Sequence, residues 1–451
     1  MVSLQREFLE PRDGLEGFTK KLEYIIKEIQ AQYLEDTLPW IVGFSGGKDS
    51  TALLQLVFYA LSRLPKYKLM KEVHVLSNDT LVENPKVVEF IDKQLDMIRD
   101  AGQKELFSHK PSLFHVVKTV PKLDDTFWLN LIGKGYPSPN RWFRWCTERM
   151  KINPTSAYIT ETVSVHGRAI ILLGTRKDES TNRSKSIKQY EIVGMRLRKH
   201  VLPNAYVFAP ISEITNKEVW HYLKTVANPW GADNQHLIEL YYKAYDNADC
   251  PLVIDTTTPS CGNSRFGCWV CTVVDHDKSM MGMIATGEQW MRPLLEYRDW
   301  LAEVRKDQSK RDTRRRTGQD GPGPFLIETR KEMLERLLVV ENQVEHQVGG
   351  ALISKQELAA IQLQWNFDGN FRYSVAEIYE RIKGEKIMID NAEVSERHRE
   401  ELAILEEVCR EQGVDPNHVR ELMELEKELL SFLRRHNIFE DIRKKIYTFV
   451  K

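Results

Sequence analysis

The sequence predicts an α/β fold in which a twisted parallel β-sheet is covered by helices. Four short apolar runs have the length and composition of strands buried on both faces; they lie at 39–44, 73–77, 114–117 and 170–173. Segments with apolar residues at helical spacing separate the first three runs. Strands that alternate with helices are typical of a parallel sheet, because each crossover needs a long connection that is usually a helix.

The predicted elements follow one another in a regular order. Apolar residues at helical spacing predict a helix at 14–34, before the first strand. A glycine-rich turn follows that strand, and the apolar residues of 51–61 predict the next helix. The helix predicted at 85–98 follows the second strand and begins with Pro85, a residue that the first turn of a helix tolerates.

Changes in composition divide the 451 residues into three regions. Residues 121–153 are rich in aromatic residues, glycine and proline, and we interpret them as a loop insertion in the first region. The segment 318–324 indicates a linker, and mostly helical patterns follow it at 327–347, 354–365, 373–384 and 395–445. The predicted domains are an α/β domain at 1–245, a cysteine-rich and basic segment at 246–325 and a mostly α-helical region at 326–451.

The overall composition excludes a fibrous, largely disordered or membrane-spanning chain. Hydrophobic residues make up 42% of the sequence and charged residues 29%, which is ordinary for a globular protein. No apolar run approaches the roughly 18 residues of a membrane-spanning helix, and residues 1–7 lack the apolar core of a signal peptide. We expect a cytoplasmic protein without membrane contact, in a compartment where thiols stay reduced.

Charge is unevenly distributed along the chain. Residues 327–451 hold 19 basic and 25 acidic residues, whereas the whole chain has 64 basic and 65 acidic residues. The first 326 residues are therefore net positive, and their densest basic cluster lies at 305–316. Such a cluster can neutralise several phosphates, or it can be a solvated helix end or loop.

Two further segments each allow two interpretations. In the aromatic insertion, Phe127, Trp128, Tyr136 and Trp145 alternate with Lys134, Arg141, Arg144 and Arg149. Aromatic rings among cations suit stacking on bases and binding of phosphates, or the rings form the core of a small subdomain. The basic residues of 196–200 either contact a DNA backbone or form the solvated face of a strand.

A glycine-rich loop stands between the first predicted strand and the helix that follows. Its sequence is Ser45-Gly46-Gly47-Lys48-Asp49-Ser50. Glycine lets the backbone approach phosphate oxygens, and the free N–H groups of a helix start point toward an anion. The serine hydroxyls add donors, and Lys48 adds a positive charge. This is not a Walker A loop, because Asp49 follows the lysine where that motif requires Ser or Thr.

Cysteine spacing predicts a metal site. Four of the six cysteines lie between 250 and 271, and Cys261, Cys268 and Cys271 form a C-x6-C-x2-C pattern. Soft thiolates suit an iron–sulfur cluster or Zn²⁺, and either needs about four ligands. Cys250 is the candidate fourth ligand by proximity. Cys409 lies among apolar residues at helical spacing, and we interpret it as a core residue.

The loop Ser45–Ser50 resembles the PP-loop of the ATP pyrophosphatase superfamily, whose members cleave ATP between the α and β phosphates. The resemblance implies an adenine nucleotide alpha hydrolase-like fold, a loop that holds pyrophosphate, and Asp49 as a ligand of Mg²⁺. The end of the second strand, with Asp79 and Thr80, is similar to the part of the superfamily's reductase-like branch that borders the nucleotide. Gly174, Arg176 and Arg183 resemble a later motif, in which the two arginines would clamp phosphates.

Three longer stretches, 126–137, 143–152 and 173–180, resemble the DNA phosphorothioation sulfurtransferases that form the C subunit of the Dnd system. This resemblance covers about residues 14–330. It implies a [4Fe–4S] cluster bound by Cys146, Cys261, Cys268 and Cys271, with Cys146 rather than Cys250 as the fourth ligand. It also implies DNA as the acceptor, a cysteine desulfurase as sulfur donor, and two partners, an ATPase subunit and a small DNA-associated subunit.

These resemblances together predict an enzyme, an ATP pyrophosphatase-type sulfurtransferase. It would adenylate a phosphate of the DNA backbone and replace a non-bridging oxygen with sulfur. Lys48, Asp49, Arg176 and Arg183 are the expected catalytic residues. The alternatives are a PP-loop RNA thiolase and a nucleotide-binding scaffold of a defence complex that does not turn over.

Overall fold

The computed structural model describes residues 16–103, 113–179, 196–244, 266–315, 319–370, 374–387, 404–416, 418–419 and 422. The chain forms two compact units. Unit 1 consists of Met1–Lys122 and Pro139–Arg298, and unit 2 of Leu123–Ser138 and Asp299–Lys451. The boundaries between these units differ from the domain boundaries predicted at 245 and 325. The reason is that residues 123–138 pack with the C-terminal helices.

Unit 1 is built on the predicted parallel sheet. Its strands are β1 (Trp40–Gly43), β2 (Val73–Asn78), β3 (Phe114–Thr119), β4 (Ala169–Leu172), β5 (Arg198–Lys199) and β6 (Ala205–Phe208). The strand order is β3-β2-β1-β4-β6-β5, and every neighbouring pair is parallel except β5 and β6. In the centre, Val42 lies opposite Val75 on one side and Leu172 on the other. The α/β prediction is confirmed.

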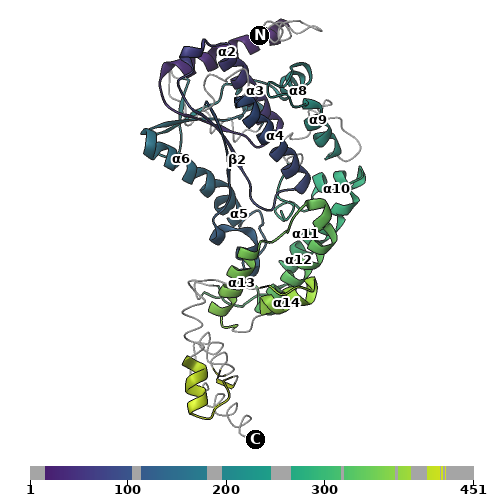
Figure 1. The fold of residues 1–451 in the computed structure, drawn as a ribbon. Helices are drawn as coiled ribbons and strands as arrows, with labels where there is room; N and C mark the ends of the chain where they lie inside the picture. Colours follow the sequence, from purple (N-terminus) through teal and green to yellow (C-terminus); the bar gives the residue numbers. More distant parts are fainter. Residues whose placement is uncertain are drawn as a thin grey trace. The chain divides into compact units, whose positions relative to one another are not determined.

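Helices cover both faces of this sheet. They are α2 (Glu16–Glu35), α3 (Lys48–Ser62), α4 (Pro85–Gln103), α6 (Asn153–His166), α8 (Asn216–Thr225) and α9 (Asn234–Lys243). Because side chains alternate along a strand, Val42 joins the core beneath α2 and α3, whereas Ile41 joins Ile159 of α6 on the other face. Figure 1 shows α3 and α4 on one side of β2 and α6 on the other.

The strand order reverses at β1. The chain runs outward from β1 to β2 and β3, then returns to place β4 on the other side of β1. In open parallel sheets, such a reversal leaves a crevice beyond the carboxyl ends of the two central strands, where ligands bind. The loop Ser45–Ser50 lies at this point, directly after β1.

Unit 2 is helical. Its main helices are α12 (Ile327–Val348), α13 (Lys355–Phe367) and α14 (Ser374–Lys383), so these three predicted helices are confirmed. Helix α12 ends at Gly349, whose φ of +73° is a left-handed conformation that favours glycine. Helix α13 begins with a capping box between Ser354 and Glu357. Of the helix predicted at 395–445, residues 404–411 are helical, and most of the rest lies outside the described residues.

The prediction that residues 121–153 form one loop insertion is wrong. Residues Leu129–Gly133 form a π-helical turn (η3) in unit 2, where Trp365 Nε1 donates to Ile132 O at 2.9 Å. Trp128 is buried and donates from Nε1 to Leu352 O at 2.7 Å. In unit 1, α5 (Trp145–Thr147) and the π-helical turn Glu148–Ile152 (η4) run directly into α6. The segment is therefore divided between the cores of the two units.

The connection to the C-terminal helices is also helical. Helices α10 (Lys278–Ala285) and α11 (Arg292–Val304) follow the cysteine-rich segment. Among the helices of the described ranges, none is both long enough and apolar enough to cross a bilayer.

Candidate active site

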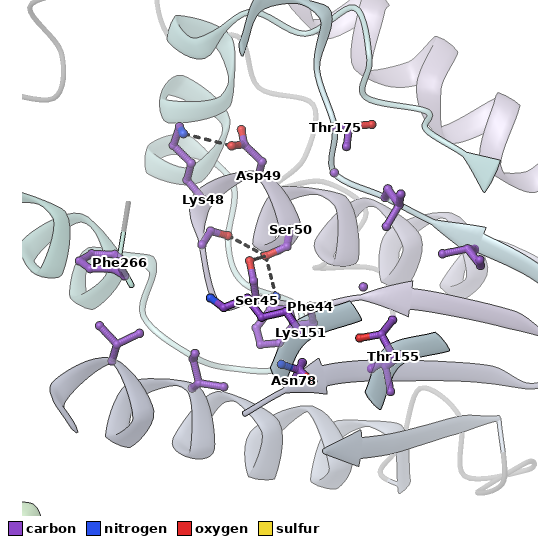
Figure 2. A pocket seen from close by; sticks show the side chains of 18 of the residues that line it. Phe44, Ser45, Lys48, Asp49, Ser50, Asn78, Lys151, Thr155, Thr175 and Phe266 are labelled. Atoms are coloured by element: carbon purple, nitrogen blue, oxygen red, sulfur yellow. Dashed lines mark hydrogen bonds and ion pairs between the residues drawn. The ribbon is translucent and has the colours of Figure 1, made fainter. Parts of the chain in front are cut away.

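A cavity of about 490 Å³ opens at the carboxyl ends of β1, β2 and β4. Its walls include Phe44, the loop after β1, Asn78 at the end of β2, and Gly174 after β4. Figure 2 shows the labelled side chains around this space, with Lys48 and Asp49 above the loop serines. The site therefore lies at the reversal of strand order, where the fold predicts a ligand.

The loop is held open by glycine and by its own serines. Gly46 has a φ of +67°, and a Cβ there would lie 2.5 Å from Cγ1 of Ile91. Ser50 Oγ donates to Gly47 O at 3.0 Å. Since a hydroxyl has one proton to donate, Ser50 Oγ must accept from the N–H of Ser45 and from its hydroxyl, both at 3.2 Å. The loop is thus ordered before any ligand binds.

Gly174 brings β4 against the first turn of α3. A Cβ at this position would lie 2.8 Å from both C and O of Asp49 and 3.0 Å from N of Ser50. These are backbone atoms, which cannot rotate away. Glycine is therefore required for the close approach of the two segments.

Asp49 is held between two cations. Its Oδ2 lies 3.0 Å from Lys48 Nζ, and its Oδ1 lies 2.7 Å from Arg176 Nε. Arg176 is buried, with 2% of its surface exposed. Each carboxylate oxygen accepts one of these bonds and keeps a second lone pair. Asp49 can therefore join a Mg²⁺ site only together with other oxygens, such as those of a nucleotide.

Arg176 is directed toward protein groups on all sides. Besides Asp49, its guanidinium contacts Ile214 O at 3.3 Å and Asn216 Oδ1 at 3.4 Å. These acceptors stand at the start of α8, where Thr215 and Glu218 form a capping box. Burial opposes ionisation of Glu218, but the Thr215 N–H and Lys21 outweigh it and lower the pKa of that carboxyl. The structure thus makes Arg176 a support of Asp49 rather than a phosphate clamp.

The two residues predicted after β2 do not line the cavity. Asp79 pairs with Lys118 at 2.9 Å and accepts from Leu81 N at 2.8 Å. Thr80 is buried, and its Oγ1 donates to Glu83 Oε1 at 3.0 Å and lies 3.2 Å from Sγ of Cys268. Asn78 and Glu83 line the cavity in their place.

The three predicted ligand cysteines that the structure describes all lie in unit 1. Cys268 pairs with Glu83 in an antiparallel bridge, and Cys271 N donates to Cys268 O at 3.0 Å in a tight turn. Cys271 also acts electrostatically on Cys146 of α5. The fourth predicted ligand, Cys261, lies outside the described residues, as do its rival Cys250 and the predicted catalytic residue Arg183.

Lys151 connects the cysteines with the cavity. It lines the cavity, and its Nζ lies 3.3 Å from Glu83 Oε1. When Cys268 is ionised, its negative charge raises the pKa of Lys151, and the carboxylate of Glu83 raises it further. Burial, joined by Glu83, raises the pKa of Cys268 well above its usual range, and burial with Cys271 raises that of Cys146.

The donor chemistry of this cluster suits a cofactor that binds several thiolates. Buried thiols of raised pKa give up their protons when a metal binds, and an adjacent ammonium offsets the charge that results. Among the described residues, no group of three or more His, Cys, Asp or Glu is placed to hold one metal ion. In a [4Fe–4S] cluster each thiolate binds a different iron, so the ligands do not have to converge on one ion.

Sequence reasoning missed several residues of the cavity. Tyr241 of α9 accepts a hydrogen bond from Lys48 N at 3.3 Å, and its ring lies 5.8 Å from Lys48 Nζ. Thr175 Oγ1 is buried and has no hydrogen-bond partner among the described residues, so it can serve a ligand. Tyr241 and Asn216 lie outside every stretch singled out in the sequence. Thr175 and Lys151 lie in the stretches 173–180 and 143–152, but nothing there marked them as cavity residues.

The remaining basic segments interact with the protein itself. In the cluster 305–316, Arg311 donates to Gly323 O at 2.9 Å, and Lys310 pairs with Glu332 at 2.7 Å. This cluster belongs to unit 2, whereas the cavity belongs to unit 1. Near β5, Arg196 pairs with Glu28 and Glu35, both at 2.9 Å. Among the aromatic residues, Phe127, Trp128 and Trp145 are buried, which favours the core interpretation for them.

Part of this chain is similar in sequence to a known protein. An uncharacterised protein of Methanocaldococcus jannaschii is 25% identical over 277 residues, which cover 60% of this chain and 44% of that protein. The chain thus spans less than half the length of this relative.

Two solved structures are also similar in part. The phosphoadenylyl-sulfate reductase of Candida auris, in a phosphate complex, is 14% identical, with a TM-score of 0.30 over 52% of this chain and 95% of that one. The FMN adenylyltransferase of Candida glabrata, with FMN and an ATP analogue, is 12% identical, with a TM-score of 0.31 over 73% of this chain and 88% of that one.

The sequence profile of the phosphoadenosine phosphosulfate reductase domain matches residues 39–274. This range is more than half of the chain and includes all six strands, the loop Ser45–Ser50 and the cysteines of the site. The chain therefore belongs to the phosphoadenosine phosphosulfate reductase domain family.

Proposed function

We propose that this protein is an ATP-dependent sulfurtransferase that replaces a non-bridging oxygen of a DNA backbone phosphate with sulfur. The observation that carries the proposal is the position of Lys151, which lines the cavity and lies 3.3 Å from Glu83 Oε1, the same oxygen that lies 3.7 Å from Cys268 Sγ. Glu83 and Lys151 thereby connect the cavity that contains the glycine-rich loop with the thiol of Cys268. The resemblance to DNA phosphorothioation sulfurtransferases adds the acceptor.

The first step would join two anions, which repel each other. A non-bridging oxygen of the DNA phosphate attacks the α-phosphorus of ATP, and pyrophosphate leaves. The charged residues that line the cavity are Lys48, Lys151 and Arg176 against Asp49 and Glu83. Their charges sum to +1, which lowers the repulsion. Lys48 and the N–H groups at the start of α3 would hold the departing pyrophosphate.

The second step would deliver sulfur to the activated phosphate. A hydrosulfide attacks the DNA phosphorus, the bond from that phosphorus to the anhydride oxygen (the former non-bridging oxygen) breaks, and AMP leaves with that oxygen. The step releases one proton and changes no oxidation state. If the donor is a persulfide from a cysteine desulfurase, one further thiol is required to cleave its S–S bond.

The cysteines would hold the implied [4Fe–4S] cluster, with Cys146, Cys268 and Cys271 as ligands and Cys261 as the fourth. When bound, the cluster supplies electronic or sulfide-binding chemistry next to the cavity, depending on whether four or three cysteines ligate it. This chain's own contribution is Lys151, which balances thiolate charge, and Thr80, whose hydroxyl lies 3.2 Å from Cys268 Sγ. The partners would be DNA, a cysteine desulfurase, an ATPase subunit and a small DNA-associated subunit, in the cytoplasm.

Pyrophosphate release tests whether the site turns over. The full-length protein, reconstituted with iron and sulfide under anaerobic conditions, is mixed with ATP, Mg²⁺ and a DNA oligonucleotide. We expect DNA-dependent release of pyrophosphate, with AMP released once sulfide is added, and the loss of both in Lys48→Ala. The control is Lys93→Ala, which removes an exposed lysine of α4 whose partner is Glu89. ATP binding without any release would point to a nucleotide-binding scaffold instead.

A further inference from the structure

Trp142 is an exposed tryptophan in unit 1. It is 95% exposed, whereas Trp145, only three residues further on, is buried. An indole is one of the largest apolar side chains, and leaving it in water gives up the free energy that its burial would contribute. Among the described residues, Trp142 therefore buries almost none of its surface. Its placement is explained if something else covers it.

The loop that presents this indole is ordered. Asn140 Oδ1 accepts from the N–H of Trp142 at 2.8 Å and from that of Phe143 at 2.9 Å. Asn140 N in turn donates to Phe143 O at 3.2 Å. At the base of the loop, Thr272 Oγ1 donates to Pro139 O at 2.7 Å. These bonds therefore fix the backbone that carries the indole and tie it to the segment that carries Cys271.

The surroundings of the indole are positively charged. Residues 140–151 hold four cations, Arg141, Arg144, Arg149 and Lys151, and one anion, Glu148. Arg141 is 70% exposed, and its contact with Asp275 is long, at 3.7 Å. An exposed ring among cations fits a base with its phosphates, because the ring stacks on the base and the cations attract the backbone. The excess of positive charge favours a polyanion, rather than an apolar protein surface, as the partner that covers the ring.

The loop is close to the cavity along the chain. Residues Trp145–Ile152 are continuously helical through α5 and η4, and Lys151 near the end of this segment lines the cavity. At about 1.5 Å per residue, the helical path from Trp145 to Lys151 is on the order of 10 Å. That length corresponds to a few nucleotides of a strand, at about 3.4 Å each when stacked.

We propose that Trp142 is a stacking platform for an unpaired base of the acceptor strand, a few nucleotides from the phosphate that enters the cavity. Arg141 and Arg144 hold the adjoining backbone. Because a base inside a duplex has both faces covered by its neighbours, the acceptor must be single-stranded or locally opened where it meets Trp142. The inference rests on the proposed function only in that the acceptor is a nucleic acid.

Oligonucleotide binding without turnover tests the platform. Fluorescence anisotropy of a labelled single-stranded DNA is compared with that of its duplex and of the same RNA sequence, using full-length protein. We expect Trp142→Ala to weaken binding of the single strand about tenfold, and Trp142→Phe to retain most of the affinity. The matched control is Tyr67→Ala. Tyr67 is 76% exposed and stands between Lys66 and Lys68, before the amino end of β2.

Three results would overturn the proposal. The first is wild-type affinity for the single strand in both Trp142 variants. The second is an equal loss in Tyr67→Ala, which would indicate nonspecific attraction to any exposed ring beside cations. The third is unchanged oligonucleotide binding with loss of the system's ATPase subunit from the complex, which would make the loop a protein interface.

The binding and sulfur-transfer measurements together also distinguish a failure of the platform proposal from a failure of the proposed function. Lys93→Ala should bind the single strand as the wild type does, because Lys93 is an exposed lysine of α4 that pairs with Glu89 outside the site. Binding that depends on Trp142 in a protein that transfers no sulfur would support the platform and contradict the function. Sulfur transfer with no dependence of binding on Trp142 would do the reverse.

Discussion

Nε of Arg176 donates to Oδ1 of Asp49 at 2.7 Å, across 127 positions of sequence. The bond joins the segment after β4 to the first turn of α3, and Lys48 holds the other oxygen of the same carboxylate. Arg176 is therefore a positioning residue. It fixes the carboxylate in the phosphate-binding loop, and the start of α8 fixes Arg176 in turn.

Substitution of Arg176 should affect both activity and stability. Arg176→Ala leaves the Asp49 carboxylate without its buried partner, and we expect a loss of about 3 kcal/mol in the free energy of unfolding. Arg176→Lys keeps the charge but cannot reach three acceptors, so its loss should be smaller. Both variants should release pyrophosphate about 100-fold more slowly, because Asp49 is misplaced. Chemical denaturation and a pyrophosphate assay measure the two effects. A raised KM for ATP with unchanged stability would instead show that Arg176 contacts phosphate.

Gly174→Ala should disrupt the cavity through the backbone. The added Cβ would lie 2.8 Å from the carbonyl of Asp49, so the end of β4 or the start of α3 must move. We expect a destabilisation of about 1–3 kcal/mol and loss of ATP binding in a titration followed by calorimetry. Gly17→Ala is the control, because nothing lies within 4 Å of a Cβ there and alanine favours the helix. Normal ATP binding by Gly174→Ala would contradict the close approach.

Glu218 predicts a dependence of stability on pH. Its pKa is lowered in the folded protein, so its contribution is present above the unfolded pKa of about 4.3 and is lost as pH falls through the folded value. Glu218→Gln keeps the cap but removes the charge that pairs with Lys21. We expect it to cost about 0.5 kcal/mol at pH 7 and progressively less below pH 4. Urea denaturation of both proteins at several pH values measures the difference. An equal cost at all pH values would show that the effect does not come from the charge of Glu218.

The central strands and flanking helices could be predicted because apolar patterning identifies a buried strand directly. Residues 39–44 and 170–173 are apolar runs, and they became neighbouring strands with Ile41 opposite Ile171. Strand β6 was missed because Ala205–Phe208 is only four residues long, although Pro203 and Pro210 flank it. Strand β5 has only Arg198 and Lys199, which pair at the edge of the sheet and carry no apolar signal.

The site was only partly predictable, for a different reason. A motif identifies residues that are close in sequence, such as Lys48 and Asp49 or Cys268 and Cys271. Lys151 and Tyr241 reach the cavity only because η4 and α9 pack there, and no local pattern marks a single lysine or tyrosine for that role. Arg176 lines the cavity as predicted. It supports Asp49 rather than clamping phosphates, because its guanidinium is buried among protein acceptors.

The cysteine ligands can be tested by metal content. After anaerobic reconstitution, we expect Cys268→Ser, Cys271→Ser and Cys146→Ser each to lose most of the bound iron and acid-labile sulfide. Cys409→Ser should retain both, because Cys409 is buried among the residues of unit 2. Visible absorption and iron analysis measure the outcome.

The same series decides between the two candidates for the fourth ligand. Loss of iron in Cys250→Ser but not in Cys146→Ser would replace Cys146. Stoichiometric zinc in place of iron, in protein purified and kept without oxygen, would contradict the iron–sulfur assignment.

The central claim is that the loop after β1 activates a DNA phosphate for sulfur transfer. Its most direct test is mass spectrometry of nuclease-digested DNA and RNA from cells that carry the protein with its partners, compared with cells that carry Lys48→Ala. We predict a phosphorothioate-linked dinucleotide in DNA that disappears in the variant. A thionucleoside in RNA that depends on Lys48, or no sulfur in either polymer with all partners present, would contradict the claim.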